Sequence, residues 1–296
     1  MNEPGDIPKL RLAPRETTEE MVARVEREQR AATLQPGHNL AEALLAPLRV
    51  GSVPYLNAVP LTRGLEDQIV FVPPSRLAEM LQQGELDAAL VSVTEVLFRD
   101  GYDVLDGVAV ASLGEVLSVF LAHRQPLEKI TRIYCDPASL TSVALLKVLL
   151  AERGSRPEFL PLPNYDDVAR LDGVLLIGDR ALDFLRAPHE HQIWDLGAAW
   201  FELTNLPFVN AVWALRRGVP NETLRRQLRE AKVFGLDTLD YIISSRHEYD
   251  LNFRKDYLGW HIHYHLGTDE KRGLNKFIEL LRKHGFGPVY EPKFVV

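Results

Sequence analysis

Short apolar runs alternate with amphipathic segments over residues 48–100. The runs at 48–53, 68–73 and 85–93 have the length and the β-branched content of buried strands. The segments between and after them, at 60–65, 75–84 and 94–100, have helical character. This β-α-β-α-β order predicts a largely parallel sheet covered by helices.

The pattern continues with two long apolar strands at 107–112 and 116–123 and then starts again. Further strands are expected at 130–136, 173–179, 191–196 and 207–215, with helices at 140–154 and 198–205. The C-terminal part is predicted to be helical at 222–236, 237–246 and 268–285. No period of 20–50 residues repeats, which argues against a solenoid.

Two α/β units in succession predict a two-lobed α/β fold with a ligand cleft between the lobes. We expect residues 47–124 and 218–296 to form lobe 1, because the C-terminal helices can pack back on the first sheet. Residues 125–217 form the expected lobe 2. Residues 1–46 are rich in charge and poor in apolar anchors, and are expected to be a loosely attached arm.

Composition narrows the choice of partners. The chain has 296 residues with 46% hydrophobic and 25% charged content, which is ordinary for a globular protein. Its net charge of −7 argues against nucleic acid or an anionic membrane as a partner. We find no apolar run long enough to span a bilayer and no secretory h-region, so a cytoplasmic location is expected.

Small polar residues occur at three strand-to-helix junctions. Ser52, Tyr55 and Asn57 follow the first strand, Ser92 ends the third, and Ser139, Thr141 and Ser142 begin a helix. Hydroxyl groups and free N–H groups at helix starts can bind an anion without a lysine. Each junction alone is explained by helix capping, but three in corresponding places indicate a shared anionic ligand. Ser118, within an apolar strand, must bond a neighbouring backbone group or face that ligand.

Two prolines bracket the first junction. Pro54 and Pro60 restrict Val53 and Val59 to extended conformations. The loop that carries Tyr55 and Asn57 is therefore expected to hold its shape before a ligand binds, which lowers the entropy cost of binding. A purely structural turn is the alternative explanation.

At these residues the sequence resembles the chorismate dehydratases of the futalosine route to menaquinone. The segments that carry the resemblance begin at about Leu48 and run in order to the C-terminus. They are "VGSVPYLNAVPL", "GELDAALVSVTEVL", "ASLGEVLSVFL", "SLTSVALLKVLL", "LLIGDRAL" and "WDLGAAWFELTNLPFVNAVWAL". Asn205 stands where the family usually has glycine, and we expect it to adopt a left-handed conformation.

The resemblance implies a type II periplasmic-binding-protein-like fold that uses neither a cofactor nor a metal. It implies the dehydration of chorismate to 3-[(1-carboxyvinyl)oxy]benzoate. The family's motif asparagine corresponds to Asn57, its strand serine to Ser118, and its Ser/Thr pair to Thr141 and Ser142. Gly178 and Asp179, which end a strand, complete the expected binding residues.

The sequence offers no obvious general base at the expected cleft. Asp179 could face the cleft, although capping of the following helix is the simpler explanation. Our hypothesis is that the substrate's own enolpyruvyl carboxylate removes the ring proton, while Asn57 and Ser118 orient the substrate by hydrogen bonds. We do not expect a metal at His261, His263 and His265, because no carboxylate or cysteine stands at a usual spacing.

Two alternatives stay open at this point. One is the related menaquinone-pathway synthase that forms dihydroxynaphthoate, which needs a second-lobe histidine, and residues 139–178 contain none. The other is a cytoplasmic binding module for a small carboxylate, since the fold alone does not imply catalysis.

Overall fold

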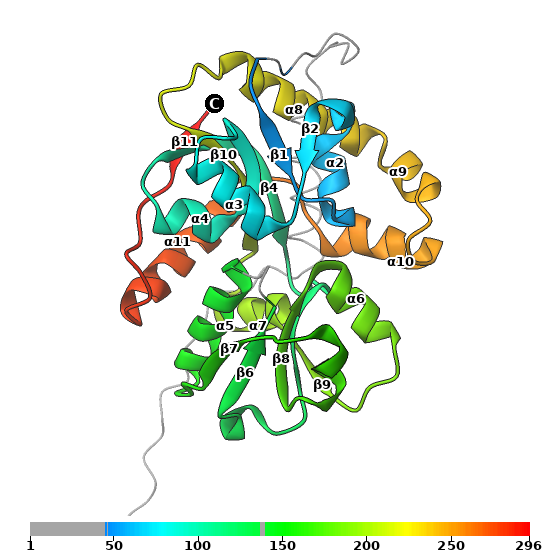
Figure 1. Cartoon of the computed structure of the whole chain (residues 1–296), viewed down its shortest axis with the longest axis vertical. Helices are drawn as coiled ribbons and strands as arrows, with labels where there is room; N and C mark the ends of the chain where they lie inside the picture. The colour runs from blue at the N-terminus through cyan, green and yellow to red at the C-terminus, as the bar shows by residue number, and fades with distance from the viewer. Residues whose placement is uncertain (1–44, 46, 137–139) are drawn as a thin grey trace, which may run out of the picture.

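The computed structural model describes residue 45 and residues 47–136 and 140–296. Two sheets, each covered by helices, form the two lobes (Figure 1). The expected two-lobed α/β fold is confirmed.

Sheet A belongs to the first lobe and has six strands in the order β11-β4-β10-β3-β1-β2. Their bounds are β1 Val50–Ser52, β2 Ile69–Phe71, β3 Ala88–Ser92, β4 Tyr102–Ser112, β10 Phe208–Arg216 and β11 Lys293–Val295. Strands β1, β2 and β3 are parallel, while β10 runs antiparallel to both β3 and β4.

The first lobe holds most of the helices of the described chain. Their bounds are η2 Leu56–Ala58, α2 Val59–Thr62, α3 Pro74–Gln82, α4 Val93–Phe98, α8 Glu222–Asp237, α9 Leu239–Ser245, α10 Leu251–Asp256, the π-helical turn η6 Tyr257–His261 and α11 Thr268–Lys283. The C-terminal helices pack on this lobe, as the sequence predicts (Figure 1).

Sheet B belongs to the second lobe and has the order β7-β6-β8-β5-β9. Its strands are β5 Val119–His123, β6 Arg132–Cys135, β7 Glu158–Pro161, β8 Gly173–Ile177 and β9 Gln192–Asp195. The helices around it are α5 Leu140–Glu152, α6 Gly178–Arg186 and α7 Leu196–Thr204.

Two strands lie in the sheet opposite to the one expected. Strand β5, assigned above to lobe 1, pairs with β8 and β9 of sheet B, and β10, assigned to lobe 2, pairs with β3 and β4 of sheet A. The chain therefore changes lobe after β4, at residues 113–118, and again through α7, before residue 208. Apolar periodicity identifies strands but not their partners, so it does not show at which residue the chain crosses.

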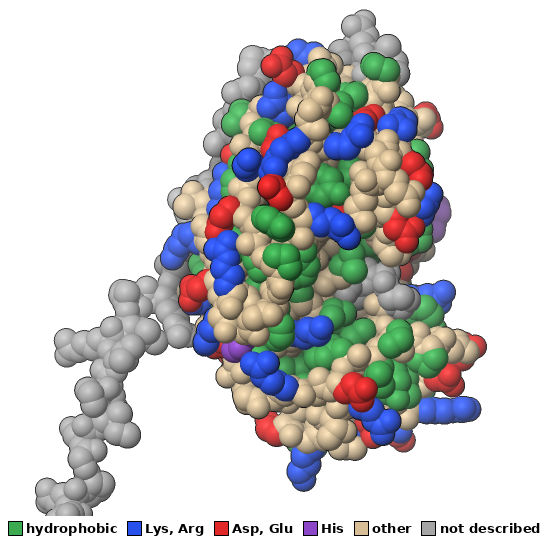
Figure 2. Space-filling model, turned by 60° about the vertical axis from the view of Figure 1, so that its left-hand side comes forward, with side chains coloured by type: hydrophobic (Ala, Val, Ile, Leu, Met, Phe, Trp, Pro, Cys, Tyr) green, Lys and Arg blue, Asp and Glu red, His purple; other side chains and the backbone are tan. Residues whose placement is uncertain are grey.

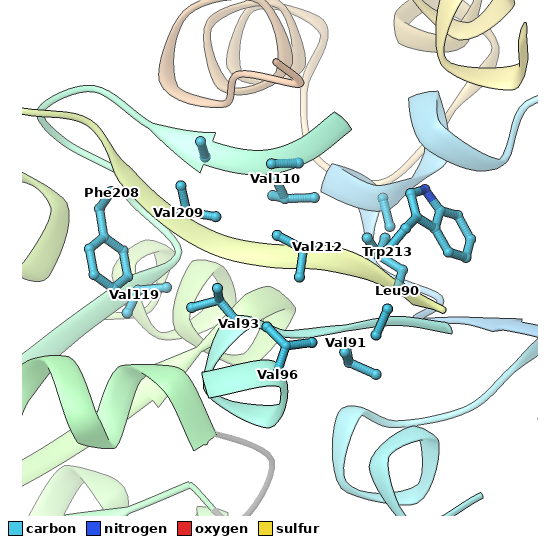
Figure 3. Packing of buried hydrophobic residues seen from close by; sticks show 14 of the residues in the cluster. Leu90, Val91, Val93, Val96, Val110, Val119, Phe208, Val209, Val212 and Trp213 are labelled. Carbon is cyan, nitrogen blue, oxygen red and sulfur yellow. The ribbon is translucent and has the colours of Figure 1, made fainter. Parts of the chain in front are cut away.

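The core of the first lobe lies where β3, β4 and β10 meet. Val91, Val110 and Val212 are almost completely buried there, and Trp213 is fully buried (Figure 3). Because β10 is the central strand of this region, its close packing fixes the strand ends that face the second lobe. Among the described helices, none is both long and apolar enough to cross a membrane.

Candidate functional site

A cleft lies between the two lobes and is lined by residues of both, a common position for a small-molecule site. Its wall includes residues from β3, β4 and β10 of the first lobe and from α5 and the β8–α6 junction of the second. The polar members of the lining are Tyr55, Asn57, Ser92, Ser118, Thr141, Ser142 and Asn210. The carboxyl ends of β1 and β3 point toward this cleft, as expected for parallel strands that serve a ligand site.

Asn57 and Ser118 are joined through a third residue, Tyr257. The Asn57 Nδ2 donates to the Tyr257 hydroxyl at 3.2 Å, and that hydroxyl donates to the Ser118 Oγ at 2.8 Å. Tyr257 is 1% exposed, and its burial raises the pKa of the phenol far above the usual value. The hydroxyl therefore stays protonated and donates to Ser118, and the Ser118 Oγ in turn donates its own proton to the Val116 carbonyl at 3.3 Å.

Local sequence explains how Asn57 is held, although the expectation for Val59 is wrong. Val59 precedes Pro60 but is helical, with a φ of −53° and a ψ of −45°, and begins α2. Tyr55 has extended backbone and precedes the single 3₁₀ turn of η2, where the Ala58 N–H donates to the Tyr55 carbonyl at 2.9 Å. Leu56 and Ala58 are buried on either side of Asn57. The alternation of apolar and polar residues thus anchors the loop and leaves the Asn57 side chain at the cleft.

The second-lobe wall includes the start of α5. Thr141 and Ser142 are both buried and line the cleft. The Thr141 Oγ1 accepts from the Thr94 N–H at 3.2 Å and lies 3.1 Å from the Thr94 hydroxyl. Because Thr94 is on α4 of the first lobe, this contact joins the two lobes at the edge of the cleft.

Ser92 and Asn210 come from neighbouring strands of the first lobe. Ser92 pairs with Ala211, the residue after Asn210. The pairing of β10 with β4 shifts between Val209 and Ala211, so Asn210 occupies a β-bulge. Bulges near active sites commonly redirect a side chain. The Asn210 Nδ2 is buried and has no hydrogen-bond partner among the described residues, although Asn210 lines the cleft.

Tyr55 and Gly178 meet across the cleft. Gly178 has a φ of +57°, and a Cβ there would lie 3.5 Å from the Tyr55 ring. Burial, together with the negative charges of Asp136 and Asp179, raises the pKa of Tyr55 to about 12. Tyr55 therefore acts as a neutral donor or acceptor at ordinary pH.

Asp179 does not cap the following helix. The N-cap of α6 is Ile177, and Asp179 lies in the first turn of the helix without a side-chain capping bond, so the capping interpretation is wrong. Asp179 is also absent from the cleft lining. Burial, reinforced by the charges of Asp183 and Glu248, raises the pKa of its carboxyl.

Two other expected binding residues are not seen in the lining. Ser52 is fully buried, and its Oγ has no partner among the described residues. Ser52 ends the buried strand β1 and is not among the residues that line the cleft. Ser139 lies outside the described residues.

The three histidines at 261–265 have separate surroundings. His261 Nδ1 lies 2.8 Å from the Glu115 carbonyl, and His265 Nδ1 lies 3.4 Å from the Lys232 Nζ. His263 forms a backbone bridge with Ala111, and burial lowers its pKa to about 4. Within the described part of the chain, no group of three or more His, Cys, Asp or Glu side chains is placed to hold a metal ion.

The cleft is uncharged at neutral pH. Among the described residues that line it, Tyr55 alone has a titratable side chain. Elsewhere, acidic and basic side chains are interspersed over the visible surface (Figure 2). Asn57, Ser92, Ser118, Thr141, Ser142 and Asn210 thus form a set of neutral hydrogen-bond donors. Such groups can hold carboxylates while leaving proton transfer to the ligand.

Sequence reasoning did not select Tyr257 or Asn210. Tyr257 lies in an interrupted helical segment 139 residues from Ser118, where no local motif marks it. The apolar run 207–215 predicts only a strand, but Asn210 is its single polar side chain, and this is the signal that marks it. Asn205 does adopt the expected left-handed conformation, with a φ of +55°.

Comparisons with known proteins agree with the resemblance seen in the sequence. The profile of a family described as "Menaquinone biosynthesis" matches residues 48–283. A curated chorismate dehydratase of Thermus thermophilus is 35% identical over 273 residues, which is 84% of this chain and 100% of the relative. A chorismate dehydratase of Campylobacter jejuni is 30% identical and covers 79% of this chain and 92% of its own length.

Solved structures share the fold. A protein from Archaeoglobus fulgidus superposes with a TM-score of 0.65 at 19% identity, covering 80% of this chain and 97% of that one. The periplasmic aliphatic sulphonate binding protein SsuA from Escherichia coli superposes with a TM-score of 0.55 at 13% identity, covering 84% and 93%. On the extent of the profile match and of the identity to the Thermus and Campylobacter enzymes, the chain belongs to the menaquinone-biosynthesis family that includes the chorismate dehydratases.

Proposed function

We propose that the protein dehydrates chorismate to 3-[(1-carboxyvinyl)oxy]benzoate and water. The observation that carries this proposal is the Asn57–Tyr257–Ser118 network in a cleft whose described lining has no charged side chain. Chorismate brings two carboxylates of its own, so neutral donors on both sides of the cleft match it. The cytoplasmic location expected from the sequence stays a prediction.

The reaction removes a proton from the ring carbon that bears the ether and hydroxide from the neighbouring carbon. The C–H electron pair becomes the new ring double bond, the C–O bond breaks, and the ring becomes aromatic. The enolpyruvyl carboxylate of the substrate takes the proton, and the proton and the hydroxide together make the water that is released. A well-oriented intramolecular base has an effective molarity on the order of 10⁵ M or more, so orientation is sufficient catalysis.

The residues on the two sides of the cleft have different roles in this mechanism. One Nδ2 hydrogen and the Oδ1 of Asn57 do not bond Tyr257. With these groups Asn57 polarises the leaving hydroxyl or holds a carboxylate. The Ser118 Oγ accepts from Tyr257 and, without substrate, donates to the Val116 carbonyl at 3.3 Å. A substrate carboxylate takes the place of that carbonyl as the acceptor of the Ser118 proton. Thr141 and Ser142, at the N-terminus of a helix of 13 residues, bind the other carboxylate.

The test compares Asn57→Ala with Asp179→Ala. Turnover is followed by ultraviolet absorption, because the cyclohexadiene of chorismate becomes a benzoate. We expect Asn57→Ala to lower kcat/KM by about 10²–10³-fold, the usual loss when one preorganised donor is removed. Asp179→Ala should change it by less than about threefold, since Asp179 is not in the lining.

Two outcomes would contradict the proposal. Loss of activity in Asp179→Ala with an indifferent Asn57→Ala would make Asp179 the base and remove the substrate-assisted mechanism. A thermal shift with chorismate in a wild-type protein that shows no turnover would indicate a binding protein of this fold.

A further inference from the structure

The chain crosses from the first lobe to the second through a strained turn that ends at Ser118. Leu117 has a φ of +60°, a left-handed conformation that residues with a branched side chain rarely adopt. The Ser118 N–H donates to the Val116 carbonyl at 2.7 Å, so residues 116–118 form a γ-turn around Leu117. A γ-turn with this sign of φ is rare and strained. Such strain persists only where the surroundings hold it.

The carboxylate of Asp195 is the group that holds this turn. It accepts from the Val116 N–H at 3.1 Å and from the Leu117 N–H at 2.8 Å. The same carboxylate caps α7 by accepting from the Ala198 N–H at 2.9 Å. Asp195 ends β9, from which the chain begins its return to the first lobe. One side chain therefore ties the two crossings of the chain together.

The two crossings are also in close steric contact. Gly197, in the first turn of α7, packs so tightly that a Cβ there would collide with the Gly114 carbonyl and press on Val116. The Ser118 carbonyl accepts from the Gly178 N–H at 2.8 Å, which anchors the far side of the turn. The turn, and with it the Ser118 Oγ, is thus fixed from both sides.

We infer that Asp195 is a positioning residue of the dehydration reaction: it holds the 116–118 turn in its strained form and so presents the Ser118 hydroxyl to the cleft. This inference rests on the proposed function. It concerns a group that is not in the cleft lining, and acts through Val116 and Leu117. Both Val116 and Ser118 do line the cleft, so a change in the turn moves the cleft wall directly.

The first test is Asp195→Asn. An amide presents one oxygen and one NH₂ group to the N–H groups that the carboxylate satisfies, so the Val116 and Leu117 bonds weaken while the size of the side chain is kept. We expect kcat to fall by about 100-fold, since a misplacement of about 1 Å costs that much, with KM changed by less than about threefold. Hydrogen exchange of the 114–119 amides should speed up in the same variant.

The second test is rescue by Leu117→Gly in the Asp195→Asn background. Glycine adopts positive φ without steric cost, so the turn should form without the carboxylate and most of the lost kcat should return. A merely structural loss of the α7 cap would not respond to a change at residue 117. Asp106→Asn is the matched control, because Asp106 accepts from the Gly107 N–H at a positive-φ turn outside the cleft lining. It should keep wild-type kcat.

The outcomes separate this inference from the proposed function. A wild-type protein that leaves chorismate unchanged contradicts the proposed function, and the exchange measurement still reports whether Asp195 holds the turn. If the wild type is active, an Asp195→Asn variant that retains full kcat would contradict the inference. It is likewise overturned if the exchange of residues 114–119 is unaltered, or if Leu117→Gly returns none of the lost activity.

Discussion

The polar groups at the two ends of sheet A differ in charge and in how they are paired. At the cleft end, Asn57, Ser118 and Asn210 are uncharged, and the buried Asn210 amide has no partner among the described residues. At the opposite end, charges are paired: Asp87 Oδ1 accepts from the Arg216 Nη2 at 2.6 Å, and Asp87 Oδ2 accepts from the Arg49 N–H at 3.0 Å. The paired charges at the opposite end support the fold, whereas the unpartnered Asn210 amide lines the cleft and is available to a ligand.

Besides Asn57→Ala, a large effect at the cleft end is expected from Tyr257→Phe. The phenylalanine keeps the packing of the ring but leaves Asn57 and Ser118 without their common partner. We expect kcat/KM for chorismate to fall by up to about 100-fold, about 2.7 kcal/mol, with little change in thermal stability. Steady-state kinetics and a melting curve measure the two quantities. An unchanged kcat/KM with a large loss of stability would make Tyr257 a structural residue only.

At the opposite end, Asp87→Asn should change stability and not activity. Removing one partner of a buried ion pair costs about 3–5 kcal/mol. The Arg216 side chain is 36% exposed, so water screens the pair and we expect a loss of about 2 kcal/mol. Urea unfolding measures the stability, and kcat/KM should stay within about twofold of wild type. A fall in kcat/KM without a loss of stability would show that the two ends of the sheet are not separate in function.

Asn210→Leu should have a smaller effect than Asp87→Asn, and it should raise or preserve stability where Asp87→Asn lowers it. Leucine removes a buried donor that has no described partner, so the free protein should be as stable as wild type or more so. If the amide binds a substrate oxygen, KM for chorismate rises about tenfold, about 1.4 kcal/mol. Asn275→Leu, on an exposed position of α11, is the matched control and should change neither. Reduced stability with an unaltered KM would place Asn210 with the structural groups.

The smallest effect is the pH dependence of the Asp87 contribution. Burial opposes ionisation of Asp87, but the Arg49 amide and the Arg216 side chain outweigh it and lower the pKa of the carboxyl. A carboxyl whose pKa is lower in the folded state stabilises the fold above its unfolded pKa of about 3.9, and this stabilisation is lost as the pH falls through the folded pKa. The stability difference between wild type and Asp87→Asn should therefore shrink below about pH 4. A difference that is constant from pH 7 to pH 3 would contradict the assigned pairing.

The sequence predicted local features well and distant ones poorly. Strands such as 173–177 and the left-handed Asn205 follow from periodicity and from the conformational range of single residues, which act locally. The sheet to which β5 or β10 belongs does not follow from periodicity, because strand pairing depends on where the chain crosses between the lobes. Tyr257 was missed for the same reason: its role depends on meeting Asn57, 200 residues away.

The two crossings of the chain between the lobes have a consequence for folding during synthesis. Strand β10 lies between β3 and β4, so the first sheet lacks this central strand until residue 216 has emerged from the ribosome, and its edge strand β11 until residue 295 has. The second sheet uses only residues 119–195, and its contacts are closer in the sequence. We therefore expect the middle of the chain to fold before the part that was made first.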